Sequence, residues 1–133
     1  MKQTLIIITT LLSIAGFGQN LDCEKFKTGT FYYPAIPEYG YSIRDKKTQK
    51  SYVKSKDMWV TWKVKWTDEC NFEMTYLSAE NSDGVYKKGD KITTTITAVD
   101  KDCYTFSSVF FSDKYPEGKQ FPPTDMCIKH EEK

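Results

Sequence analysis

The chain has 133 residues, a formal net charge of +1 and an aromatic content of 15%. This length predicts one domain. A near-neutral charge without a basic block excludes a nucleic-acid-binding surface and attraction to anionic membranes, and the aromatic content excludes a disordered chain.

The first 18 residues have the pattern of a secretory signal peptide. Lys2 gives a positive start, residues 5–14 are mostly apolar, and Gly16 and Gly18 place small residues before a cleavage point. The apolar stretch is too short for a spanning helix, and no later run is apolar enough to form one. We therefore predict an exported protein, periplasmic or secreted. Its mature chain begins at Gln19 and forms a single β domain over residues 19–133, ending in a charged, frayed tail.

The mature chain contains four cysteines, at Cys23, Cys70, Cys103 and Cys127. An even number after a secretory signal indicates two disulfides formed in an oxidising compartment. The spacing lacks the close cysteine pairs of a zinc site, and the single histidine, His130, lies in the charged tail, so we predict no metal and no cofactor. Asp22 directly before Cys23 does not fit a lipobox, which argues against a lipid anchor. Four cysteines allow three pairings, and spacing alone does not select one.

Alternation of apolar and polar residues predicts antiparallel strands along most of the mature chain. After a short helical turn near residues 21–26, the expected strands are 28–33, 41–44, 50–54, 58–66, 72–76, 91–99 and 103–111, with a short one near 126–129. The alternation is clearest from Met58 to Trp66, where Lys63 and Lys65 fall opposite an apolar face. Residues 114–124 contain three prolines and a glycine, and we expect them to be irregular.

These short strands predict an all-β fold, a small antiparallel meander of about seven or eight strands. It closes into a lipocalin-like barrel or forms a strongly curled sheet. In the 91–99 strand the small groups of Thr94 and Ala98 are expected to face inward with Ile92 and Ile96. They either make room for large indoles or leave a cavity.

Four segments resemble a known family. Residues 23–31 resemble a C-x-x-F-[KR]-T-G-x-F opening, and residues 62–70 resemble a W-x-V-x-W-x-D-x-C segment. Lys88-Gly89-Asp90 and Tyr104-Thr105-Phe106 complete the pattern. Together they are similar to a family of short exported proteins from Bacteroidota, mostly without an assigned function. The resemblance implies a small lipocalin-like β fold and supplies no active-site residues.

Some members of that family bear a DNA topoisomerase IV name. A topoisomerase needs a helical DNA-binding domain with a catalytic tyrosine and a basic surface for the duplex. This chain is predicted to be exported, neutral and nearly all β. We therefore interpret the name as a misnomer.

The resemblance also bears on the disulfides. Cys23 and Cys70 belong to the shared pattern, whereas Cys103 and Cys127 are additions to it, and this favours the pairs Cys23–Cys70 and Cys103–Cys127. The chief alternative is a Cys70–Cys103 bridge, because these two cysteines lie at equivalent points of two similar hairpins. That bridge would leave Cys23 to pair with Cys127.

No catalytic constellation is visible, so we predict that the protein is not an enzyme. The single histidine excludes Ser-His-Asp and Cys-His arrangements in the body of the chain, and the acids fall in predicted turns.

The most informative segment for function is 31–41, which holds five aromatic residues and two prolines. Rings held by prolines lose little entropy when a partner covers them. We predict a non-enzymatic binding module for a small apolar ligand or an envelope protein, using Tyr32, Tyr33, Tyr39, Tyr41 and Trp59. Two alternatives stay open. The rings could only cover one end of the barrel, or the loop could inhibit a secreted enzyme.

Overall fold

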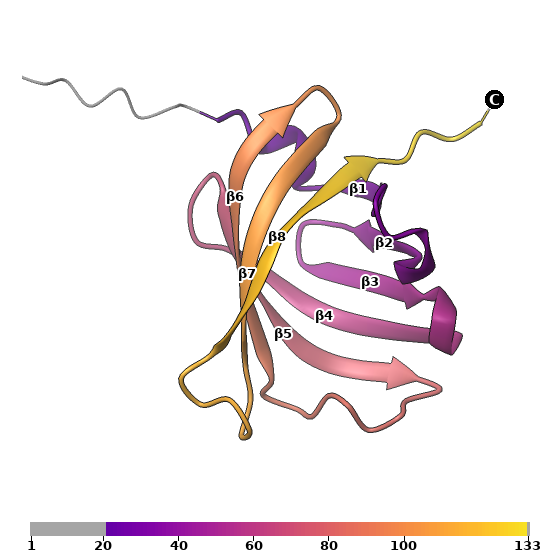
Figure 1. The fold of residues 1–133 in the computed structure, drawn as a ribbon, viewed down its shortest axis with the longest axis vertical. Coiled ribbons are helices and arrows are strands. Elements are labelled where there is room, and N and C mark those ends of the chain that lie inside the picture. The colour runs from indigo at the N-terminus through magenta and orange to yellow at the C-terminus, as the bar shows by residue number, and fades with distance from the viewer. Residues whose placement is uncertain (1–20, 133) are drawn as a thin grey trace, which may run out of the picture.

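A computed structural model describes residues 21–132 as a closed antiparallel barrel (Figure 1). The strands are β1 (Gly29–Tyr32), β2 (Tyr41–Arg44), β3 (Thr48–Val53), β4 (Met58–Trp66), β5 (Asn71–Glu80), β6 (Lys91–Asp100), β7 (Cys103–Phe111) and β8 (Lys119–Ile128). Three short 3-10 turns accompany them, η1 (Glu24–Phe26), η2 (Pro37–Tyr39) and η3 (Lys54–Lys56). The all-β prediction is confirmed, and the barrel replaces the alternative of an open curled sheet.

Each strand pairs with the next along the chain, and β1 pairs with β8 to close the barrel. Antiparallel order places the connections alternately at two ends. The N-terminal segment and turns 45–47, 67–70 and 101–102 lie at one end, called here the closed end. Loops 33–40, 54–57, 81–90 and 112–118 lie at the other, called here the loop end. The signal peptide predicted for residues 1–18 lies outside the described residues. Within residues 21–132, no helix has the length and apolar character needed to cross a membrane.

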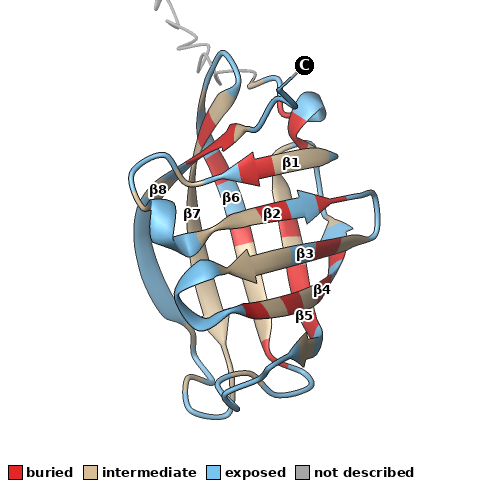
Figure 2. Cartoon of the chain, turned by 90° about the vertical axis from the view of Figure 1, so that its right-hand side faces the viewer, coloured by how far each residue is buried: buried red, intermediate tan, exposed pale blue. Residues whose placement is uncertain are grey.

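The core follows directly from the period-two pattern. In β4, Met58, Val60, Trp62 and Val64 are buried, while Lys63 is exposed. Figure 2 shows the same pattern, with buried residues alternating with less buried ones along β4. The buried residues form two clusters. One joins β4 to β5, and the other joins η1 and β1 to β6, β7 and β8.

The disulfide pairing favoured by the resemblance is confirmed. Cys23 bonds to Cys70, which ties the N-terminal segment to the turn after β4, and Cys103 bonds to Cys127 across the β7–β8 pair. The bonds close sequence separations of 47 and 24 residues. Loop closure of this size stabilises a fold by roughly 3–4 kcal/mol per bond. Two disulfides also indicate an oxidising compartment.

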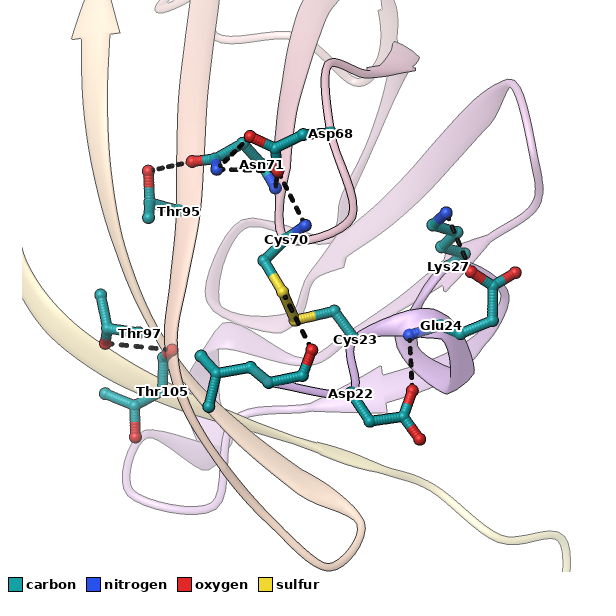
Figure 3. The surroundings of a disulfide bond; sticks show 11 residues. Asp22, Cys23, Glu24, Lys27, Asp68, Cys70, Asn71, Thr95, Thr97 and Thr105 are labelled. Carbon is teal, nitrogen blue, oxygen red and sulfur yellow. Dashed lines mark hydrogen bonds and ion pairs between the residues drawn. A yellow bond between two sulfur atoms is a disulfide. The ribbon is translucent and has the colours of Figure 1, made fainter. Parts of the chain in front are cut away.

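The turn that carries Cys70 is organised by Asp68 (Figure 3). Its carboxylate accepts hydrogen bonds from the backbone N–H groups of Cys70 and Asn71, both at 2.9 Å, and from the side-chain amide of Asn71. An aspartate that satisfies the backbone two and three residues ahead is a common way to fix a tight turn. The side-chain amide oxygen of Asn71 in turn accepts a hydrogen bond from the Thr95 hydroxyl on β6.

Two expectations about the C-terminal half are wrong. Residues 114–124 are irregular only as far as Gly118, because β8 begins at Lys119 and contains Pro122 and Pro123. The two prolines stand where the β7–β8 register shifts, opposite Ser107, and only the last two residues of β8 pair with β1. The prolines therefore occupy a bulge on a strand edge, where a missing N–H disturbs the ladder least.

The second correction concerns Ala98, which was expected to face inward. The β6–β7 register shifts between Ile96 and Ala98. The shift leaves Ala98 exposed and turns Val99 onto the core instead.

Candidate functional site

Four aromatic side chains form a row on the outer face of the barrel. Strand register places Tyr32 beside Tyr41, Tyr41 beside Tyr52, and Tyr52 beside Trp59. Cross-strand neighbours project from the same face of a sheet, and the residues between them, such as Ser42, point inward and are buried. The ring centres of Tyr41 and Tyr52 are 5.8 Å apart, and those of Tyr52 and Trp59 are 5.1 Å apart. We call these residues the aromatic row.

A groove of about 570 Å³ lies against one end of this row. Its walls are four tyrosines together with Pro34, Pro37 and Gly40, and we call it the tyrosine groove; the tyrosines are Tyr32, Tyr33, Tyr41 and Tyr52. Lys54 and Lys129 also line it. The Lys129 ammonium lies 5.0 Å from the centre of the Tyr41 ring. Among the described residues no acidic side chain lines the groove, so its charged lining residues are both lysines.

The 33–40 loop is held against the barrel. The N–H groups of Tyr39 and Gly40 donate to the carbonyls of Ile36 and Pro37, which forms η2. Gly40 has a positive φ of 74°, and a Cβ at this position would lie 2.1 Å from the carbonyl oxygen of Tyr52. Only glycine allows the loop to approach β3 so closely. The loop therefore presents a fixed surface.

Tyr33 and Tyr39 have different roles in this loop. The Tyr33 ring packs on Phe106 with centres 6.5 Å apart and joins the edge of the second core cluster. Burial raises the pKa of Tyr33 above its ordinary range, so its phenol stays neutral. Tyr39 stacks edge-on against Tyr33 at 5.5 Å and is 52% exposed. Tyr33 is thus the anchor of the loop, and Tyr39 is its exposed ring.

A hydrogen bond orients the central ring of the aromatic row. The Tyr52 hydroxyl donates to Asp57 at 2.9 Å, and this bond raises the pKa of Tyr52. Asp57 ends η3 in a left-handed conformation with φ of 45°. The η3 turn therefore fixes a ring that the groove and the aromatic row share.

The structure brings together most of the residues that the sequence predicted for binding. Tyr32, Tyr33 and Tyr41 line the tyrosine groove, and Tyr39 stands beside it on Tyr33. Trp59 belongs to the aromatic row but does not line the groove.

Three residues of the groove were missed: Tyr52, Lys54 and Lys129. The signal for Tyr52 was present in the sequence. A hairpin turning near residues 45–47 pairs position 52 with position 41, and this pairing puts both rings on one face.

Arg44 is a buried charged residue to which the sequence analysis assigned no role. It is 3% exposed, and no carboxylate among residues 21–132 pairs with it. Its guanidinium donates to the Gln49 side chain at 2.7 Å, to the Phe26 carbonyl at 2.8 Å and to the Tyr104 hydroxyl at 3.0 Å. It also lies 4.7 Å from the ring of Phe31. Arg44 is therefore a structural clamp that holds η1 over the closed end.

Within the described part of the chain, no group of three or more histidine, cysteine, aspartate or glutamate side chains is placed to hold a metal ion. No family model, curated protein or solved structure matches this chain. The resemblance to exported Bacteroidota proteins stays a prediction, and a function has to be argued from the geometry of the groove.

Proposed function

We propose that this protein is an exported, non-enzymatic binding protein that docks an acidic segment of an extracytoplasmic protein in the tyrosine groove. The observation that carries the proposal is the combination, at one place on the outer face, of an aromatic row, a loop fixed against the barrel and two lysines without an acid beside them.

The rings favour binding because their positions are set before a partner arrives. Pro34 and Pro37 restrict the loop, Gly40 allows it to contact β3, and Tyr33 anchors it in the core. A tyrosine offers a large contact area with few rotatable bonds, so little conformational entropy is lost on binding. Preorganisation of this kind lowers the cost of association.

The charge of the groove favours an acidic partner. Lys54 and Lys129 line it, and complementary charges across an interface raise the association rate and select among partners. Binding of this kind weakens as salt rises, because exposed charges are screened over about 8 Å at physiological ionic strength.

The shape of the region supports a protein rather than a small molecule. The groove is on the outside of the barrel, and Tyr32 in its wall and Tyr39 beside it are 39% and 52% exposed. Clusters of exposed apolar side chains rimmed by polar residues are typical of interaction surfaces. The alternative is an inhibitor that inserts a protruding loop into an enzyme. The 33–40 loop is held against the barrel, and this favours a docking surface over such an inhibitor.

Capture from an extracytoplasmic extract of the source cells tests the proposal. The immobilised protein is compared with a Tyr32→Ala/Tyr39→Ala variant and with Leu77→Ala, a control that removes an exposed apolar side chain of β5. We expect a species that the wild type and Leu77→Ala retain, that the tyrosine variant loses, and that rising salt releases. Equal retention by all three proteins would contradict the proposal. N-terminal sequencing of the natural protein checks export separately, with a start at Gln19 expected.

A further inference from the structure

A second cavity, of about 450 Å³, opens at the loop end between the 81–90 and 112–118 loops. Its walls include the apolar and aromatic side chains of Tyr86, Ile92, Phe110, Tyr115 and Phe121. Three lysines, Lys87, Lys114 and Lys119, and two aspartates, Asp90 and Asp113, also line it. We call it the mouth cavity. It shares no lining residue with the tyrosine groove.

Strand register shows that Lys119 points to the inside of the barrel. Met74 is beside Ile92, Ile92 is beside Phe110, and Phe110 is beside Lys119. Met74 is a buried core residue, so this row follows the inner face. An apolar row therefore ends in one inward-facing lysine.

The same register places Phe121 beside Ser108 on the inner face. Phe121 is nevertheless 39% exposed, and Lys119 is exposed too. The reason is that β8 pairs with β1 only at its last two residues, so solvent reaches the inner face of the rest of the strand. A ligand can therefore enter the mouth cavity without strand separation.

The ammonium of Lys119 lies beside two aromatic rings and is not paired with a carboxylate of the described residues. It lies 5.2 Å from the centre of the Tyr115 ring and 5.7 Å from that of Phe121, and it forms no ion pair within residues 21–132. The buried acid of this region, Asp90, accepts a hydrogen bond from the backbone N–H of Lys87 at 2.8 Å. This bond stabilises the 81–90 loop. Asp113 is the other acid of the lining.

The depth of the cavity is limited by aromatic packing. The Tyr86 ring packs against Trp62, with ring centres 5.0 Å apart, and against Tyr76, with ring centres 5.8 Å apart. Both partners belong to the first core cluster. The space above them is in the lower part of the range of about 300–1,000 Å³ found for small-molecule sites.

We infer that the mouth cavity binds a medium-chain amphipathic monocarboxylate. Its apolar body lies against Ile92, Phe110 and Phe121, and its carboxylate pairs with the Lys119 ammonium. The apolar row explains why the ligand has a hydrocarbon body. The inward-facing Lys119, which forms no ion pair among the described residues, explains why it has a single carboxylate. The packing of Tyr86 on Trp62 and Tyr76 limits the length of the hydrocarbon chain.

Decanoate below its aggregation concentration, with decanol as the uncharged match, tests this inference by NMR titration of the full mature protein. We expect decanoate to shift the signals of Ile92, Phe110 and Lys119. Lys119→Met keeps the apolar stem and removes the charge, and it should weaken decanoate binding about tenfold or more while leaving decanol binding unchanged. Lys63→Met, on the exposed outer face of β4, is the matched control and should change neither.

A second variant tests the apolar wall independently of the charge. Phe121→Ser alters a partly exposed side chain outside both core clusters, so the fold is retained, and it should weaken decanoate and decanol alike. The inference is overturned if decanoate shifts no signal of the mouth cavity, if the shifts gather in the tyrosine groove, or if Lys119→Met binds decanoate like the wild type. These outcomes leave partner capture by the tyrosine groove untouched, so the two proposals fail separately.

Discussion

Arg44 donates a hydrogen bond to the carbonyl oxygen of Phe26 at 2.8 Å, so the only arginine of the chain joins the inner face of β2 to the turn that covers the closed end. The clamp is expected to matter for stability. Arg44→Leu leaves the Gln49 side chain and the Phe26 carbonyl without their partner in a buried site. We expect a loss of about 3 kcal/mol of unfolding free energy, measured by urea denaturation. Lys50→Leu, on the exposed face of β3, should change stability by less than about 0.5 kcal/mol. Equal effects of the two changes would contradict the clamp.

The two loop tyrosines are expected to separate stability from binding. Tyr33→Ala removes a ring that packs on the core, and we expect a loss of about 3 kcal/mol in the unfolding free energy, as for other buried aromatic residues. Tyr39→Ala removes a ring that is 52% exposed and should cost less than about 0.5 kcal/mol. Thermal and urea unfolding measure both. A Tyr39→Ala protein that melts as early as Tyr33→Ala would support the alternative that all these rings only cover the barrel end.

The Asp68 turn gives the protein an acid-sensitive element. Hydrogen bonds from Asn71 and Cys70 lower the pKa of the Asp68 carboxyl below its ordinary value of 3.8. Because the folded pKa is the lower one, this stabilisation is complete above pH 3.8 and is lost as the pH falls through the folded pKa. We expect Asp68→Ala to be less stable than the wild type at neutral pH and the difference to shrink in acid. Glu69→Ala, in the same turn, is the control and should change the unfolding free energy at neutral pH much less than Asp68→Ala does.

Each disulfide is expected to stabilise the barrel on its own. Replacing Cys23 and Cys70 together by serine should lower the unfolding free energy by roughly 3–4 kcal/mol, and replacing Cys103 and Cys127 together should have an effect of similar size. Urea unfolding measures both. Mass spectrometry of a non-reduced digest should recover the 23–70 and 103–127 pairs. A peptide joining Cys70 to Cys103 would contradict the structure.

The strand order could be predicted because local alternation specified it. Residues 58–66 show an apolar face in the sequence and bury that face in the structure. The errors fell where register shifts decide orientation. Ala98 faces out because of a shift in the β6–β7 pair, and Pro122 lies within a strand because a shift in the β7–β8 pair accommodates it. Such shifts depend on both strands of a pair, so one strand's pattern does not reveal them.

The candidate site could be predicted only in part for a similar reason. The aromatic loop is visible in the sequence because its rings are close along the chain. Lys129 joins the groove from the far end of the chain, and Arg44 meets Phe26 and Tyr104 only when the barrel closes. The mouth cavity likewise depends on the register that brings Lys119 beside Phe110.

The central claim is that a partner covers the tyrosine groove, and photo-crosslinking in the source cells tests it most directly. A photoreactive phenylalanine derivative is placed at position 39, beside the groove, and in a second strain at position 77, on the exposed side of β5. We predict a single protein adduct from position 39 that is absent from position 77 and is suppressed when Lys54 and Lys129 are replaced by glutamate. No adduct from position 39, or the same adduct from both positions, would contradict the account.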